Sequence, residues 1–169
     1  MRGWLLDTNV ISELRKLRPD AGVVQFVEDQ PGETLFVSEV TFAEIRFGIE
    51  QLGDAARRAD FTQWLDRVLR PMFEGRALEL NEDIILRWKM LQSEGRRRGH
   101  TFSQPDLFIA ATAAYHAFVA VSRDCSEFVA AGVPGFDPWS AVFHHEGRAV
   151  MLAAPVSLAR LRQTNNTIQ

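Results

Sequence analysis

The sequence predicts an α/β protein, a three-layer α/β/α sandwich built on a mainly parallel sheet. The first observation is that short apolar runs at 4–6, 35–37 and 118–121 are each followed by polar residues, as expected for buried strands. The second is that apolar residues at helical spacing lie between these runs. Strands that alternate with helices form parallel sheets with helices on both faces.

The first half of the chain supplies two strands and two helices. Trp4-Leu5-Leu6 is an unbroken apolar run that ends at Asp7, and Leu35-Phe36-Val37 is a second run that ends at Ser38. Runs this short suit strands that are buried on both faces of a sheet. The apolar residues that follow recur three and four positions apart, which puts them on one helical face. They are Phe42, Ile45, Ile49 and Leu52 in one helix, and Phe61, Leu65, Val68 and Leu69 in the next.

The second half continues the alternation. The segment 77–80 predicts one further short strand, and apolar residues at helical spacing within 84–91 predict a helix before Gly95. The alanine-rich segment 107–114 predicts a compact helix suited to close packing. The apolar segment 118–121 then predicts the last strand of the series.

The chain of 169 residues suits one main domain. We expect one main domain at 1–143 and a C-terminal extension at 144–169, partly disordered or packed on the domain, because the extension has little periodicity and a polar end. The single cysteine, Cys125, rules out an internal disulfide framework and suits a reducing compartment. With no signal-like or membrane-spanning apolar run, we expect a cytoplasmic protein. The net charge of −3 argues against a generic polyanion binder but leaves room for a local basic face.

Four acidic residues follow predicted strands or lie near the start of the next helix. Asp7 ends the first strand, Glu44 lies in the helix after the second, Asp106 opens the alanine-rich helix, and Asp124 follows the last strand. In an open parallel sheet these positions share one edge, at the carboxyl ends of the strands, where ligands bind. We therefore expect the four carboxylates to converge.

Each acid also has a purely structural explanation. Glu44 and Asp106 lie three residues after a threonine and a serine, which is the spacing of a capping box, while Asp7 and Asp124 can close a turn or cap a helix. For any one acid a cap is the commoner role. Taken together, the four would repel one another and raise at least one pKa unless a cation lies among them.

A hard divalent cation resolves this conflict. Mg²⁺ and Mn²⁺ prefer carboxylate oxygens. The histidines and the cysteine show no zinc-ligand spacing. Such an ion supplies what phosphodiester hydrolysis needs, namely an acidified water and charge neutralisation at the phosphate. We expect Asp7, Asp106 and Asp124 to hold the metal directly or through water, and Glu44 to ligate it or to orient the water.

Five segments, taken together, resemble one protein family. They are LLDTNVISE, VSEVTFAEIRFGI, PDLFIAATAAYH, AVSRDCSEF and FDPW, in this order over residues 3–140. The combination is similar to PIN-domain proteins, in particular the VapC/FitB-like toxins of type II toxin–antitoxin systems. The resemblance implies a metal-dependent ribonuclease on a five-strand parallel sandwich, with the family's four acids matched, position by position, by Asp7, Glu44, Asp106 and Asp124.

Three further residues match the family's motifs. Thr8 and Asn9 belong to the first motif, and Ser122 is the small hydroxyl residue before the fourth acid. We expect Thr8 and Ser122 to orient carboxylates, whereas Asn9 either does the same or is a turn residue. The chain departs from the family in the segment before the third acid, 103–105, and in its longer tail.

Two basic clusters could contact nucleic acid. Arg96, Arg97 and Arg98 end a predicted helix, where cations favour the helix dipole. They could instead form a phosphate-binding rim that leads to Asp106. The run at 15–18, Arg-Lys-Leu-Arg, is a second candidate rim.

The resemblance also implies partners: an RNA substrate, an inhibitory antitoxin, a second copy of the chain in a homodimer, and operator DNA that is bound only through the antitoxin. Two alternatives remain open. One is a non-catalytic role in an antitoxin–DNA complex. The other is a phosphohydrolase with an aspartyl nucleophile, which is disfavoured because the second acid that it needs is replaced by Asn9. The RNA target and the number of metal ions are left open by the sequence.

Overall fold

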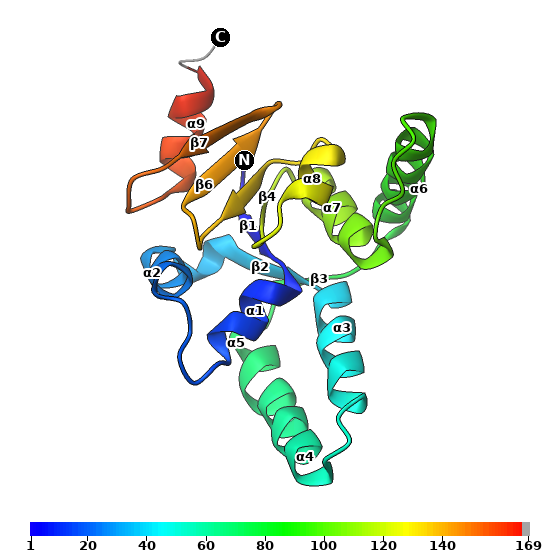
Figure 1. The fold of residues 1–169 in the computed structure, drawn as a ribbon, viewed down its shortest axis with the longest axis vertical. Coiled ribbons are helices and arrows are strands. Elements are labelled where there is room, and N and C mark those ends of the chain that lie inside the picture. Colours follow the sequence, from blue (N-terminus) through cyan, green and yellow to red (C-terminus); the bar gives the residue numbers. More distant parts are fainter. Residues whose placement is uncertain (167–169) are drawn as a thin grey trace.

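A computed structural model of the chain describes residues 1–166 and contains one seven-stranded sheet (Figure 1). The strand order is β3-β2-β1-β4-β5-β6-β7. The first five of these positions are parallel, and β6 and β7 continue the sheet as antiparallel strands. The strands are β1 Trp4–Leu6, β2 Leu35–Ser38, β3 Ala77–Leu78, β4 Val119–Val121, β5 Gly135–Asp137, β6 Val142–His145 and β7 Arg148–Met151.

The α/β class is confirmed, but the predicted count of five strands is wrong. After β5 the chain turns back twice, and the hairpin of β6 and β7 extends the sheet beyond its parallel part. These strands of four residues each leave only a weak alternating pattern in the sequence.

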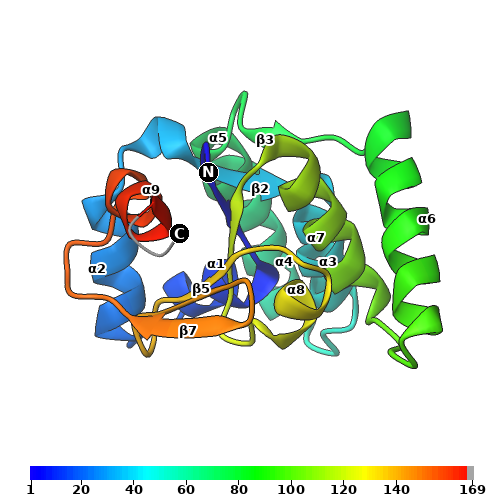
Figure 2. The same cartoon turned by 90° about the horizontal axis from the view of Figure 1, so that it is seen from above.

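Helices cover both faces of the sheet, as predicted. Trp4 and Leu6 of β1 pack in one core cluster with α1, α2 and α9, whereas Leu5 packs in the other with α6, α7 and α8. This division follows from the alternation of side chains along a strand. Seen from above, α2 and α9 lie on one side and α6 and α7 on the other (Figure 2). The helices are α1 Thr8–Leu14, α2 Ala21–Asp29, α3 Glu39–Glu50, α4 Ala55–Trp64, α5 Arg70–Met72, α6 Glu82–Arg97, α7 Gln104–His116, α8 Ser126–Ala130 and α9 Leu158–Asn166, with a 3₁₀ turn at Gly32–Thr34 and a π-helical turn at Leu65–Leu69.

The helix starts differ from the expected capping boxes. Ser38 caps α3 by accepting a hydrogen bond from the Val40 N–H (3.2 Å), so this helix begins at Glu39. Thr41 therefore lies inside the helix, and among residues 1–166 its buried hydroxyl has no hydrogen-bond partner. A capping box that includes Glu44 is thus wrong. Ser103 occupies the N-cap position of α7 but makes no side-chain hydrogen bond to the backbone there.

The C-terminal segment packs on the amino-terminal end of the sheet. Gln30 links the two parts: its Oε1 accepts from the Trp4 indole N–H (2.9 Å), and its Nε2 donates to the Val156 carbonyl (2.8 Å). Leu161 of α9 is completely buried. The predicted division between 143 and 144 falls inside β6 and stays a prediction, and the last part of the expected frayed end, 167–169, lies outside the described residues.

No helix within the described range, 1–166, is both long enough and apolar enough to cross a bilayer.

Candidate active site

Asp7 lies at the centre of the sheet's carboxyl edge. β1 pairs in parallel with both β2 and β4, so Asp7 follows the middle of three neighbouring strands. The residue is only 5% exposed. Its Oδ1 accepts from the Thr8 backbone N–H (2.7 Å), and its Oδ2 accepts from Ser122 Oγ (2.7 Å) and from Asn9 Nδ2 (2.8 Å). The carboxylate therefore caps α1, as expected, and is held in one orientation by three donors.

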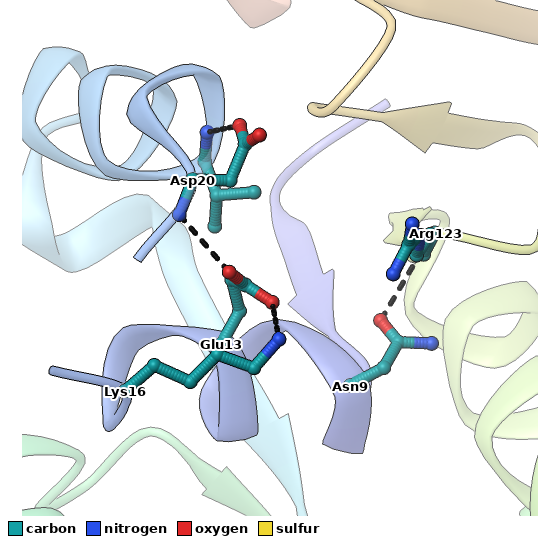
Figure 3. Close-up of polar contacts among 6 residues, drawn as sticks. Asn9, Glu13, Lys16, Asp20 and Arg123 are labelled. Atoms are coloured by element: carbon teal, nitrogen blue, oxygen red, sulfur yellow. Dashed lines mark hydrogen bonds and ion pairs between the residues drawn. The ribbon is translucent and has the colours of Figure 1, made fainter. Parts of the chain in front are cut away.

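Ser122 and Asn9 join the end of β4 to the start of α1. The buried Ser122 hydroxyl donates to Asp7 and accepts from Asn9 Nδ2 (2.8 Å) and from the Asp124 N–H (3.2 Å). The other side-chain atom of Asn9, Oδ1, accepts from the Arg123 N–H (3.2 Å) (Figure 3). Both residues thus contact the first and fourth acids or their immediate neighbours, and Asn9 does more than form a turn.

The second acid is tied to the first motif by Thr8. Glu44 lies half-buried in the second turn of α3, and its Oε2 accepts from Thr8 Oγ1 (2.5 Å). Because Thr8 follows Asp7 directly, the hydroxyl bridges the two acidic segments. Thr8 and Glu44 also line a groove of about 430 Å³ between α1, α3 and α4.

The third acid, Asp106, is half-buried in the first turn of α7, beside an acid that sequence reasoning missed. Glu127 of α8 accepts from the Ser103 N–H through Oε2 (3.2 Å). Its Oε1 lies 3.3 Å from His100 Nε2, without the alignment of a hydrogen bond. The spacing Asp124-x-x-Glu127 could have indicated that Glu127 shares the turn of the fourth acid.

Burial and mutual repulsion shift the pKa values of these acids in different directions. Burial raises the pKa of Asp7 to about 6, against the hydrogen bonds from Ser122 and Thr8, and the charges of Asp106 and Glu44 raise it further. Burial also raises the pKa of Asp106, opposed by the Ser103 side chain and reinforced by Glu127 and Asp124. Hydrogen bonds from Ser126 instead lower the pKa of the exposed Asp124.

The donor set suits a divalent cation. Arg160 aside, the ion pairs among the described side chains of residues 1–163 involve other carboxylates, so no lysine, histidine or other arginine there neutralises Asp7, Glu44, Asp106 or Asp124. Oxygen-only ligands with uncompensated charge are what Mg²⁺ and Mn²⁺ favour. In the same range, no three Asp, Glu, His or Cys side chains lie close enough together to form a ready-made ion cage. The charges nonetheless influence one another, since Asp7 is affected by Asp106 and Glu44, and Asp106 by Glu127 and Asp124.

Arg96, Arg97 and Arg98 are exposed at the C-terminal end of α6. Figures 1 and 2 show α6 at the outer edge of the molecule, with α7 between it and α1. Arg98 pairs with Glu94 (3.1 Å), as expected for cations near a helix C-terminus. Their role as an RNA rim stays a prediction.

Comparison with known proteins matches this architecture to one family. Residues 4–130 match the PIN domain. The chain is 38% identical to the VapC ribonuclease Y4jK of Sinorhizobium fredii over 135 residues. This aligned region spans 80% of this chain and 96% of that protein. It is 33% identical over 135 residues to toxin FitB of Neisseria gonorrhoeae, covering 80% and 97%. The solved structure of FitAB bound to an IR36 DNA fragment has a TM-score of 0.75 at 32% identity, over 80% of this chain and 95% of that one. The chain therefore belongs to the PIN-domain family, in its VapC/FitB-like group.

Proposed function

We propose that the protein is the toxin of a type II toxin–antitoxin system, an endoribonuclease that hydrolyses RNA phosphodiester bonds with Mg²⁺ or Mn²⁺. The observation that carries this proposal is Asp7: a buried carboxylate, repelled by two other acids and paired with no cation in the described chain, at the edge of a parallel sheet where ligands bind. The ribonuclease and toxin names of the relatives support it.

Each acid has a part in this proposal. Asp7, Asp106 and Asp124 would hold the ion directly or through water, and Glu44 would ligate it or orient the attacking water. When bound, the ion supplies positive charge to the developing charge on the phosphate and acidifies water. The three hydrogen bonds on Asp7 fix which lone pairs remain for a ligand, and Thr8 holds the Glu44 carboxylate towards the same edge.

The same proposal includes partners. A cognate antitoxin would neutralise the toxin, operator DNA would be bound only through that antitoxin, and the toxin would act as a cytoplasmic homodimer. The FitAB–DNA structure supports such an assembly. Among the aromatic residues of α3, Phe47 is 67% exposed and available for a partner, whereas Phe42 is buried in the core.

An RNA-cleavage assay with Asp7→Asn tests the catalytic proposal. The purified wild-type protein should cleave RNA with Mg²⁺ or Mn²⁺ and lose this activity in EDTA. Asp7→Asn should lower the rate about a hundredfold or more, equivalent to about 2.7 kcal/mol of transition-state stabilisation.

Asp54→Asn is the matched control. Asp54 also caps a helix, accepting from the Arg57 N–H (2.9 Å), but it is exposed at the start of α4. Asparagine caps equally well, so this variant should cleave like the wild type. Full activity of Asp7→Asn would refute the site. No cleavage by the wild type, together with operator binding by its antitoxin complex, would favour the non-catalytic alternative.

A further inference from the structure

Two arginines near the acidic edge lie over aromatic rings and have unused hydrogen-bond donors. The Arg15 guanidinium lies 4.9 Å from the Phe61 ring centre and 5.5 Å from that of Trp64. The Arg123 guanidinium lies 5.7 Å from the Trp139 ring centre. Both side chains are exposed, and within residues 1–166 neither guanidinium makes a hydrogen bond or an ion pair.

The other arginines that lie over aromatic rings are engaged by the protein. Arg70 pairs with Asp66 (3.2 Å), and Arg76 donates to the carbonyls of Gly32 and Leu35 (2.7 Å each). These polar contacts account for the positions of both side chains. In the described part of the chain, no such polar contact uses the guanidinium donors of Arg15 and Arg123.

Both arginines flank the acids. Arg123 stands between Ser122 and Asp124, and its backbone N–H is held by Asn9 at the start of α1. Arg15 follows the last residue of α1 and lines the groove that Thr8 and Glu44 also line. The two guanidinium-bearing residues are thus placed at opposite ends of α1, about 10 Å apart along its axis, with Asp7 at one end.

Glu13 forms no ion pair with Arg15 or Arg123. This buried glutamate is already engaged: its Oε2 pairs with Lys16 Nζ (2.6 Å), and its Oε1 accepts from the Asp20 N–H (3.0 Å) (Figure 3). The bond from Lys16 holds the pKa of Glu13 below its usual range, with a small contribution from Arg123. Within the basic run at 15–18, Lys16 is therefore occupied and Arg15 is available.

An aromatic ring orients a guanidinium without neutralising it. The planar group keeps its five in-plane donors for a bidentate phosphate contact, and the ring reduces the freedom lost on binding. Cations are needed at this edge, because its carboxylates would otherwise repel the polyanionic RNA backbone.

We propose that Arg15 and Arg123 form an arginine clamp that binds backbone phosphates of single-stranded RNA on either side of the acidic edge. The clamp rests on the proposed ribonuclease function and specifies how that site holds its substrate. It assigns the phosphate contacts to these two residues and not to the cluster Arg96–Arg98.

The test measures binding of a fluorescein-labelled single-stranded RNA oligonucleotide to the full-length protein in EDTA, at several salt concentrations. Arg15→Gln and Arg123→Gln keep most of the aliphatic stem that packs on the rings. Each substitution should reduce the magnitude of the slope of log K for RNA binding against log salt concentration by about 0.7, and the double variant by about 1.4. The reason is that each phosphate contact releases counterions from the RNA, and a variant that lacks the contact releases fewer of them. Arg96→Gln is the matched control and should leave the slope unchanged.

Steady-state cleavage with Mg²⁺ gives a second readout. Each clamp variant should raise KM several-fold with kcat within twofold, while Arg15→Lys and Arg123→Lys should restore the salt slope but only part of the affinity. An unchanged slope and KM in folded Gln variants would overturn the clamp, as would weaker antitoxin binding with unaltered RNA binding. Failure of the wild type to cleave RNA would refute the nuclease proposal alone, because the binding slopes test the clamp without catalysis.

Discussion

Replacing Asp7 with asparagine should stabilise the metal-free protein at neutral pH, although it removes the proposed activity. Asp7 has a folded-state pKa of about 6 against an ordinary value of 3.8. The folded protein therefore binds the proton more tightly than the unfolded chain. The resulting stability is fully present below pH 3.8 and is lost as the pH rises through 6. At 1.36 kcal/mol per pKa unit, the loss by pH 7.5 is about 3 kcal/mol.

Asparagine carries no charge, so it avoids this loss, but it fits the hydrogen bonds less well. Asp7 accepts from three donors, and an amide nitrogen in place of Oδ2 would face the Asn9 donor. That mismatch costs about 1–2 kcal/mol at every pH. The variant should thus be about 1–2 kcal/mol less stable than the wild type at pH 4 and about 1–2 kcal/mol more stable at pH 7.5.

Urea denaturation in EDTA between pH 4 and 8 measures this crossing of the two stability curves. Asp54→Asn, at an exposed cap, should follow the wild type throughout. Adding Mg²⁺ at pH 7.5 should raise the free energy of unfolding of the wild type and not that of Asp7→Asn. Two curves that stay parallel over the whole pH range would refute the reasoning, because they would show that burial of the Asp7 charge does not control this stability.

Three further changes test the packing. Gln30→Ala should lower the free energy of unfolding, measured by urea denaturation, by about 2–4 kcal/mol, because the buried Trp4 indole N–H and the buried Val156 carbonyl lose their hydrogen-bond partner. Gln25→Ala, at an exposed position, should change it by less than about 0.5 kcal/mol. Gly95→Ala should lower the Tm, since its Cβ would lie 2.4 Å from a Phe102 ring carbon, while Gly48→Ala, in a helix with open space around the new Cβ, should raise it by the equivalent of about 0.5–1 kcal/mol. Deleting 152–169 should lower the free energy of unfolding by about 5 kcal/mol or more by exposing the face that α9 covers, and an unchanged denaturation midpoint would show that residues 152–169 are dispensable for stability.

The elements with strong local patterns were predictable, and those that depend on distant pairing were not. The strands 4–6 and 35–37 and the helix at 107–114 are apolar enough to be recognised from sequence alone. β5 consists of Gly135–Asp137, and its burial depends on β4 and on Cys125, whose side chain lies against Gly135. A three-residue strand has too few positions to show a period, so only its neighbours define it.

The sequence by itself predicts which residues lie at the carboxyl edge of the sheet. Strands that alternate with helices favour a parallel sheet, and its carboxyl edge is where Asp7, Glu44, Asp106 and Asp124 are expected. The same reasoning indicated Ser122 as a hydroxyl beside the fourth acid, and its bonds to Asp7 and to the Asp124 N–H follow that expectation.

Only the tertiary structure decided how these groups behave. The pKa of Asp7 depends on its burial and on the charges of Asp106 and Glu44, which are far from it in the sequence, so a local motif does not reveal it. Glu127 became a neighbour of Asp106 only because α8 packs against α7. Likewise, Arg15 and Lys16 are adjacent in sequence just after α1, yet Lys16 pairs with the buried Glu13, whereas the Arg15 guanidinium lies over the Phe61 ring.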